Sequence, residues 1–471
     1  MTTGGTMSRR AVVIGGSVAG MLAAAALSRS VDEVTVLERD ELRDGPQPRR
    51  RIPQARHAHV LLPSGRDAVQ ELLPGVDVRE RLLASGAHEQ SLTDILGFGP
   101  QGWFRRWPPV VDELLLTLCS RDLLEWTVRE AVLGSTSVTV RRGEVVSLRG
   151  TAGRVTGVGV LADGTEEDLP ADLVVDASGR GSRVEHWLES LGVTDIPTDE
   201  VDSGLVYASR VFRVPPGAEN FPLTQVEAEP DHSRPGRSGN LVPIEGGRWL
   251  VSLAGTRGGE PTADPEEFTR FALGLRHPLI GQLISGAEPL GEVSLSRSTR
   301  NRRRDFDKAA MPEGLVVLGD AVATYNPVYG QGMSVAALGA LALSRRLQQA
   351  DVTAPGFARE VQRAAAKSVS AAYTLSTSQD QWFPEVIGKA PTLVDRLLSR
   401  YMGRMAHVAT TSYPVSAAMC SVITLQADAS RLVHPKLLLA TLRGPVMEPL
   451  SGPPLTPEES GFLDALGPVP V

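Results

Sequence analysis

Residues 11–40 read AVVIGGSVAGMLAAAALSRSVDEVTVLERD, and this stretch decides the fold of the N-terminal half. Val12, Val13 and Ile14 form the apolar, β-branched run of a strand that is covered on both faces. A glycine turn, an alanine-rich helical segment and a second apolar strand ending at Glu38 follow. This order predicts one β-α-β unit with two parallel strands.

The glycines of this unit predict a dinucleotide site. Gly15 lets the backbone turn sharply after the strand, and Gly20 lets the helix lie close against it. The N–H groups at the helix start would bind a pyrophosphate. Glu38, at about the 20-residue spacing of dinucleotide-binding units, would accept hydrogen bonds from the ribose hydroxyls. Ser17 departs from the G-x-G-x-x-G pattern at its middle glycine.

Length and composition are those of a soluble, multi-domain protein. The 471 residues exceed the roughly 250–300 that one hydrophobic core usually serves, and no apolar run approaches the roughly 20 residues of a membrane span. Small polar residues interrupt the run after Arg9 and Arg10, which disfavours a secretory signal. A net charge of −7 gives no pull toward nucleic acid. The two cysteines, Cys119 and Cys420, fit a reducing cytoplasm and predict no thiolate metal site.

Two later strand ends carry the same kind of signal. Leu173–Val175 is an apolar strand that breaks into DASGRGSR (176–183), and the strand at 314–318 breaks into Gly319 and Asp320. The carboxyl ends of parallel strands meet at the ligand crevice of an open α/β sheet. An acid at Asp320 suits a sugar or ribityl hydroxyl, and the Gly330-Gln331-Gly332 backbone at a helix start suits negative charge.

Between these strand ends, other patterns predict additional sheets. Short strands at 138–142, 143–148 and 155–161, with an Asp163-Gly164 hairpin turn, predict a β-meander. Alternating segments from about 202 to 296 predict an antiparallel sheet, with one helix near 265–275. The predicted domains are 1–200 (dinucleotide-binding, first part), 201–296 (inserted substrate sheet), 297–350 (dinucleotide-binding, second part) and 351–471 (helices and an extended tail).

Some stretches leave two interpretations open. The arginines at 49–51 lie in a proline-rich loop that is either solvated or lines a diphosphate. His57 and His59 are two apart and point to opposite faces of a strand, so packing or a hydrogen bond is favoured over a metal site. The aromatic cluster of Trp103, Phe104 and Trp107 either covers a cofactor ring or belongs to the core.

Together the three strand ends resemble the three FAD contacts of the para-hydroxybenzoate hydroxylase class. Within that class, PQARHAH (53–59), ADLVVDASGRGS (171–182) and GDAVATYNPVYGQGMS (319–334) are similar to the flavin-dependent epoxidases of polyether ionophore biosynthesis. The resemblance implies a Rossmann-like α/β domain that holds FAD without a covalent link. The residues that pattern and resemblance place at FAD are Gly15, Gly16, Ser17, Gly20, Glu38, Arg39, Arg121, Asp176, Gly179, Gly319, Asp320, Pro327, Gly330, Gly332 and Met333.

The same resemblance implies the chemistry. Electrons from NAD(P)H, delivered directly or through a flavin reductase, and O2 would give a flavin C4a-hydroperoxide that epoxidises an alkene of a lipophilic polyene. Tyr325, Asn326 and Pro327 would form the flavin and oxygen environment. The candidate substrate walls from the sheet are Val206, Tyr207, Phe212 and Leu253.

Three other activities suit the same fold. An aromatic hydroxylase and a flavin-dependent isoprenoid reductase are the open alternatives to the epoxidase. A flavin halogenase relies on a lysine near the flavin, and the first lysine of this chain is Lys308, which disfavours it. A non-enzymatic FAD-binding scaffold is disfavoured because it would not need an enclosed second domain.

Overall fold

The centre of the molecule is a five-stranded parallel sheet in the order β20-β12-β1-β2-β8. The computed structural model describes residues 8–49, 51–108, 114–297 and 299–467. The strands of this sheet are β1 (Arg10–Ile14), β2 (Glu33–Glu38), β8 (Thr139–Arg142), β12 (Leu173–Asp176) and β20 (Leu315–Val317). The predicted β-α-β unit is confirmed, and both later strand ends lie beside it, as an α/β sheet requires.

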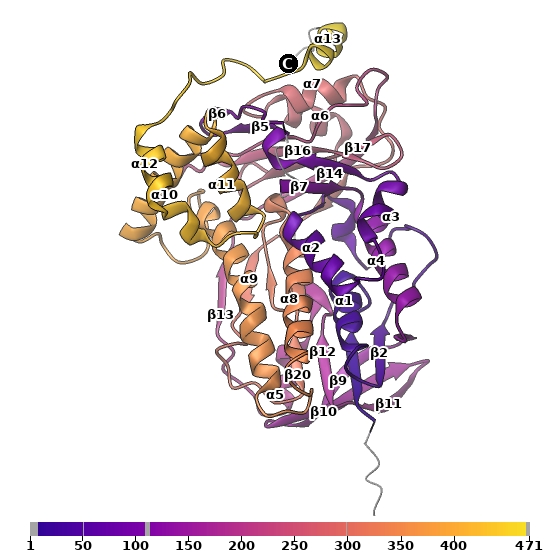
Figure 1. Cartoon of the computed structure of the whole chain (residues 1–471). Coiled ribbons are helices and arrows are strands. Elements are labelled where there is room, and N and C mark those ends of the chain that lie inside the picture. Colours follow the sequence, from indigo (N-terminus) through magenta and orange to yellow (C-terminus); the bar gives the residue numbers. More distant parts are fainter. Residues whose placement is uncertain (1–7, 50, 109–113, 298, 468–471) are drawn as a thin grey trace, which may run out of the picture.

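Helices cover one face of this sheet, and α1, α8 and α9 run side by side across it (Figure 1). Val13 and Val36 point into the core beneath the helices, whereas Val12 and Leu37 point to the opposite face, because side chains alternate along a strand. The helices on the first face are α1 (Val18–Leu27), α2 (Pro63–Leu72), α3 (Val78–Ala84), α4 (Arg121–Ser135), α8 (Gly332–Leu347) and α9 (Phe357–Asp380).

The opposite face is covered by the β-meander and by α5 (Val184–Ser190). The meander consists of β9 (Glu144–Thr151), β10 (Arg154–Ala162) and β11 (Thr165–Pro170), and its predicted hairpin turn is confirmed at Asp163 and Gly164, whose φ angles are 48° and 81°. The first predicted strand of this group joins the parallel sheet instead, as β8 paired with β2.

A second large sheet has seven strands in the order β18-β14-β17-β16-β15-β5-β6. Helices α6 (Pro265–Leu273) and α7 (Leu279–Ser285) cover one of its faces (Figure 1). Its strands are β5 (Leu96–Gly99), β6 (Gly102–Trp103), β14 (Val206–Arg213), β15 (Thr224–Val226), β16 (Arg237–Ile244), β17 (Arg248–Gly255) and β18 (Ser294–Ser296).

This sheet also contains two strands that come before the predicted insert of residues 201–296. Strand β5 pairs in parallel with β15, with Leu96 opposite Thr224, so residues from before the insert complete the sheet. Pairing between strands that lie far apart in the chain cannot be recognised from a local sequence pattern. Smaller sheets are formed by β3 (Val60–Leu61), β7 (Leu115–Leu118) and β4 (His88–Ser91), and by β13 (Thr198–Val201), β19 (Asn301–Arg304) and β21 (Ala323–Thr324).

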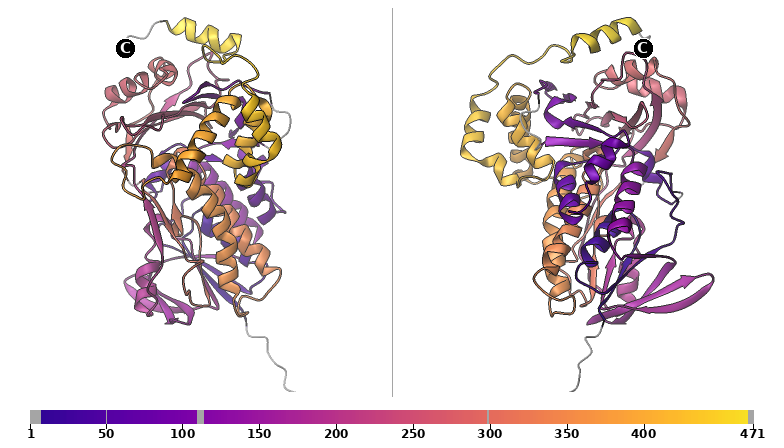
Figure 2. Two further views of the ribbon diagram at one scale, coloured as in Figure 1. Left: turned by 90° about the vertical axis from the view of Figure 1, so that its left-hand side faces the viewer. Right: turned by 45° about the vertical axis from the view of Figure 1, so that its right-hand side comes forward.

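The C-terminal region is helical, as expected, and the stretch that was predicted to be an extended tail contains one further helix. Residues Pro457–Leu466 form α13, which packs against α7 (Figure 2). Thr456 and Glu459 form a capping box, and the Glu459 carboxylate also pairs with Arg106 at 2.7 Å. The other helices here are α10 (Leu393–Ala409), α11 (Tyr413–Ile423) and α12 (Pro435–Arg443). In the described part of the chain, no helix is long and apolar enough to span a membrane.

Candidate functional site

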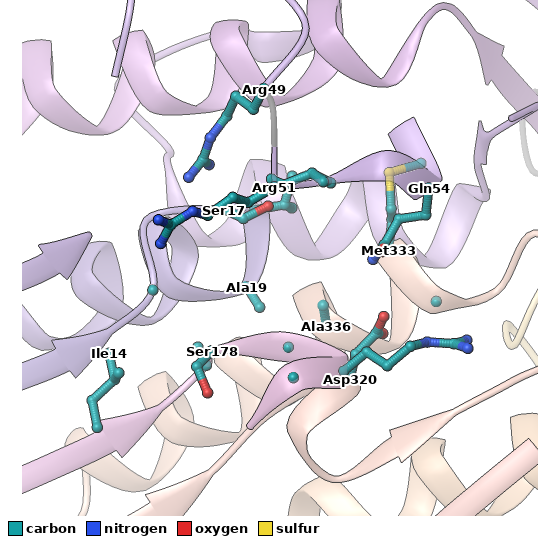
Figure 3. Close-up of a pocket in the computed structure, with 18 of the residues that line it drawn as sticks. Ile14, Ser17, Ala19, Arg49, Arg51, Gln54, Ser178, Asp320, Met333 and Ala336 are labelled. Carbon is teal, nitrogen blue, oxygen red and sulfur yellow. The ribbon is translucent and has the colours of Figure 1, made fainter. Parts of the chain in front are cut away.

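A hollow of about 270 Å³ lies at the carboxyl ends of β1, β12 and β20. Figure 3 shows Ser17, Ser178 and Asp320, which come from the three predicted segments, around this one space. The predicted cofactor and flavin-environment residues that line it are Gly15, Ser17, Glu38, Arg39, Arg121, Gly179, Asp320, Tyr325, Asn326, Pro327, Gly330, Gly332 and Met333. The topology therefore brings together residues more than 300 positions apart.

Four of the predicted residues do not line the hollow but hold the backbone around it in place. A Cβ atom at Gly20 would lie 1.8 Å from the carbonyl oxygen of Gly15, so only glycine allows α1 to approach β1 this closely. Gly319 has a φ of 63°, and a Cβ there would lie 3.1 Å from the Ala19 side chain. Gly16 uses its N–H to donate to Glu38 at 2.8 Å.

Asp176, the fourth, is a correction to the sequence analysis. Its side chain is fully buried, and its carboxylate accepts hydrogen bonds from Ser178 Oγ at 2.6 Å and Ser182 Oγ at 2.5 Å. Burial raises the pKa of this carboxyl, and the two serines oppose that shift. Asp176 thus holds the 178–182 turn, in which Gly179 and Arg180 reach the hollow.

Glu38 lies at the edge of the hollow in a fixed orientation. Its carboxylate accepts the N–H of Gly16, and also the N–H of Asp40 at 2.9 Å. Arg49 contacts the same carboxylate at 2.6 Å. These contacts connect the first β-α turn to the end of β2, at the position where the sequence predicts that a ribose binds.

A second carboxylate, Glu125 on α4, was not singled out as a site residue. It accepts from Ser17 Oγ at 2.7 Å and pairs with Arg49 at 2.5 Å and with Arg121 at 3.4 Å. Burial alone would raise the pKa of Glu125, but Arg121 and Arg49 hold it below its usual value. Arg49 thus belongs to the site and is not solvated; Arg50, beside it, lies outside the described residues.

Several polar groups in the hollow lack a protein partner within the described part of the chain. The Asp320 carboxylate, at the end of the β20 strand, accepts no hydrogen bond there, and burial raises its pKa against the influence of Arg180 and Arg121. The buried Tyr325 hydroxyl is also unpartnered, and burial raises its pKa. Unsatisfied polar groups around a hollow are suited to a polar ligand such as a ribityl chain.

The start of α8 supplies a positively polarised wall. The helix begins at Gly332, two residues after Gly330, which adopts a left-handed φ of 63°. The first N–H groups of a helix have no partner within it, and the helix dipole adds partial positive charge there. Because Gly332 and Met333 line the hollow, this end faces the space where a ligand would carry negative charge.

His59 also lines the hollow, and it was not among the predicted site residues. Its Nδ1 lies 2.7 Å from the carbonyl oxygen of His57, which can only accept, so Nδ1 carries the proton. Burial lowers the pKa of His59 to about 3, which keeps the ring neutral and leaves Nε2 as a hydrogen-bond acceptor. His57 is buried and bonds Ser209 Oγ at 2.8 Å, so the expected packing and hydrogen-bonding role holds for it.

The candidate substrate walls separate onto two faces of the seven-stranded sheet. Tyr207 points toward the FAD-binding half, where its hydroxyl donates to Asn326 Oδ1 at 3.0 Å. Phe212 and Leu253 lie on the other face, in the core beneath α6 and α7. They are therefore not walls of the site, and Val206, which shares the side-chain direction of Phe212 along β14, is 4% exposed.

Comparison with known proteins decides the family. The family model described as FAD binding domain matches residues 9–354, which is most of the chain. The chain belongs to this family. The matched region contains β1, Glu38, Asp320 and the start of α8. The donors and acceptors described above fit a flavin dinucleotide.

Relatives and solved structures agree with this assignment. Protein Rv3254 of Mycobacterium tuberculosis is 33% identical over 80% of this chain and 81% of its own length. Kynurenine 3-monooxygenase of Salinispora tropica is 27% identical over 69% of this chain and 70% of its own. The flavin-dependent brominase Bmp2, as a triple mutant, superposes with a TM-score of 0.66 over 92% of this chain and 99% of its own at 14% identity. PqsL from Pseudomonas aeruginosa, a probable FAD-dependent monooxygenase, has a TM-score of 0.57 over 79% of this chain and 96% of its own at 19% identity.

Proposed function

We propose that this protein is an FAD-dependent monooxygenase that transfers one oxygen atom of O2 to an alkene of a lipophilic polyene. The observation that carries the proposal is the single hollow in which Glu38, Asp320 and the start of α8 meet. Bound FAD, once reduced, would supply the electrons that activate O2. The names of two relatives, from Salinispora tropica and Salinispora arenicola, support oxygen insertion, since both are kynurenine 3-monooxygenases.

The residues of this chain would bind FAD, orient the substrate and exclude water from the site. Glu38 would accept the ribose hydroxyls and Asp320 the ribityl hydroxyls, while the N–H groups of Gly332 and Met333 would stabilise negative charge on the flavin ring. The neutral His59 offers an acceptor and no proton at neutral pH. A transfer that rests on positioning and on exclusion of water needs little further acid–base chemistry.

The polyene as substrate rests on the likeness to polyether epoxidases and on the apolar face next to the hollow. Tyr207 and Ala254 of the sheet, with Leu205 just before β14, form a buried apolar cluster with Val328, beside the pocket-lining Asn326 and Pro327. A long apolar chain would gain about 25 cal/mol for each Å² of apolar surface that it buries. We place the substrate between this face of the sheet and the C-terminal helices.

Hydroxylation of a small aromatic compound is the second candidate, and the two kynurenine 3-monooxygenase relatives favour it. Halogenation receives less support. Although two structural neighbours are brominases or halogenases, no lysine is among the described residues that line the hollow, and Lys308 pairs with Asp305 at the surface.

The test is product analysis with labelled oxygen. The purified protein is incubated with FAD, NADPH or NADH, and a lipophilic polyene under ¹⁸O2, with and without an added flavin reductase. We expect a product heavier by one ¹⁸O atom per oxidised alkene, and less of it with the Asp320→Asn variant at FAD concentrations that do not saturate that variant. If the protein were instead a flavin-dependent isoprenoid reductase, the product would carry two added hydrogens and no ¹⁸O. Labelled phenolic products from small aromatics, with no reaction of the polyene, would replace the epoxidase by the hydroxylase.

A further inference from the structure

One short segment, residues 326–330, forms a wall shared by the two halves of the molecule; we name it the wall segment. On one side Asn326, Pro327 and Gly330 line the hollow. On the other side Val328 packs against Tyr207 and its apolar neighbours in the seven-stranded sheet. The position of the wall segment therefore sets the spacing between the cofactor hollow and the substrate face of the sheet.

A carboxylate lies behind this wall. Asp380, the last residue of α9, is 2% exposed, and both amides of an asparagine pair donate to it. Asn326 Nδ2 donates to its two oxygens at 2.9 and 3.2 Å, and Asn301 Nδ2 donates at 2.7 Å. Its hydrogen-bond partners in the described part of the chain are all neutral groups, because the third is Ser203 Oγ at 3.4 Å.

The direction of these hydrogen bonds is fixed by the backbone. The N–H of Val328 donates to Asn326 Oδ1 at 3.0 Å, and the N–H of Asn326 donates to Asn301 Oδ1 at 2.7 Å. A backbone N–H cannot accept, so neither amide can be turned around. Both must present their NH2 group to residue 380, and the Tyr207 hydroxyl must donate to Asn326 Oδ1. Position 380 accordingly needs a side chain that only accepts.

We propose that Asp380 is a positioning residue that fixes the wall segment, and thereby sets the substrate face of the sheet in register with the FAD hollow. Asp380 does not line the hollow and acts through Asn326. The chain uses a buried carboxylate here because it can accept from two amides and a hydroxyl at once. Asparagine, nearly the same in shape, would place an NH2 group against an NH2 group.

The test is the Asp380→Asn variant of the full-length protein loaded with FAD. We expect FAD to bind about tenfold more weakly, because an NH2 group at position 380 would oppose the Asn326 NH2 group and move the wall segment that lines the hollow. We also expect the visible circular dichroism of the bound flavin to change, because Asn326 and Pro327 move. The matched control is Glu459→Gln in α13, a buried carboxylate paired with Arg106, which should lower the melting temperature and leave both flavin readouts unchanged.

A double-mutant cycle with Tyr207→Phe tests the connection to the sheet. If the network is one unit, the effects of Asp380→Asn and Tyr207→Phe on the FAD dissociation constant are not additive. Should Asp380→Asn fail to fold, Asn301→Ala removes one donor from Asp380 and the acceptor of the Asn326 N–H, and should shift the same two flavin readouts in the same direction. Additive effects, or variants that lower the melting temperature while keeping wild-type FAD affinity and circular dichroism, would overturn the proposal.

Discussion

Ser17 donates a hydrogen bond from Oγ to the carboxylate of Glu125, 2.7 Å away on helix α4. This contact gives a structural reason for a serine at the middle position of the glycine turn. Arg121 contacts the same serine oxygen at 3.0 Å, so the hydroxyl links an acid and a base at the entrance of the first β-α-β unit. A glycine at this position would leave Glu125 with its arginine partners alone.

The first prediction concerns this hydroxyl. Ser17→Ala should lower the free energy of unfolding by about 1–2 kcal/mol, because a partly buried, charge-assisted hydrogen bond is lost. Ser17 makes no helix-capping hydrogen bond with its side chain, so the loss would not be a capping effect. Urea denaturation of the FAD-free protein measures this change in the free energy of unfolding. Ser28→Ala, at the other end of α1, removes only a neutral bond to Ala25 and should cost less; equal losses would contradict the prediction.

The second prediction separates FAD binding from folding at Asp320. Asp320→Asn should weaken FAD binding by about tenfold, because the carboxylate would bond ligand hydroxyls. The same change should leave the FAD-free protein as stable or make it more stable at pH 7. Burial raises the pKa of Asp320, so the charged form is disfavoured in the folded state. Flavin fluorescence and thermal melting measure the two effects, and an FAD dissociation constant unchanged from wild type would refute the site assignment.

The third prediction is that FAD is held without a covalent bond. Both cysteines are buried and outside the lining of the hollow, and the Nδ1 of His59 is engaged by a backbone carbonyl. Denaturation by heat or urea should therefore release all of the flavin. The free flavin should then pass through an ultrafiltration membrane that retains the chain. Flavin that remains on the denatured chain would show an attachment, and mass spectrometry of proteolytic peptides would locate it.

The fourth prediction concerns acid stability and His57. Burial, with a smaller effect of Arg56, lowers the pKa of His57 from 6.5 to about 4. Between these two pH values the unfolded chain takes up a proton that the folded chain does not, so stability is lost as the pH falls from 6.5 toward 4. The decrease in unfolding free energy from pH 7 to pH 5 should be about 2 kcal/mol smaller in His57→Gln than in wild type.

Denaturant titrations at both pH values measure this difference. His88, an exposed residue of β4, provides the matched control, since His88→Gln should follow the wild-type acid sensitivity. If His57→Gln shows the same decrease as wild type, the ring of His57 takes up its proton in the folded protein too, and the prediction is wrong.

The fifth prediction concerns the electron supply. The chain has one glycine fingerprint, and we assign it to FAD, so NADPH and NADH should bind only transiently or a separate reductase should deliver the electrons. Anaerobic mixing with NADPH, with NADH and with a flavin reductase, followed by flavin absorbance, distinguishes these routes. A nicotinamide dinucleotide bound tightly to the oxidised protein at a site of its own would contradict the prediction.

The sequence by itself determined the parallel core and the position of the hollow. Residues 11–40 carry a strand, a glycine turn and a helix in contiguous order, and the strand ends at Asp176 and Asp320 are equally local. Apolar periodicity and glycine backbone freedom act over a few residues, so they can be recognised without knowing the neighbours. Parallel strands then must bring their carboxyl ends to one edge.

Tertiary structure alone decided which side chains meet there. Alternation along β14 places Tyr207 and Phe212 on opposite faces, but only packing determines that Tyr207 meets Asn326 while α6 and α7 cover Phe212. The contacts of Ser17 with Glu125 and of Asn326 with Asp380 span long stretches of chain. Such pairings depend on how separate elements pack, and no local pattern of residues encodes that arrangement.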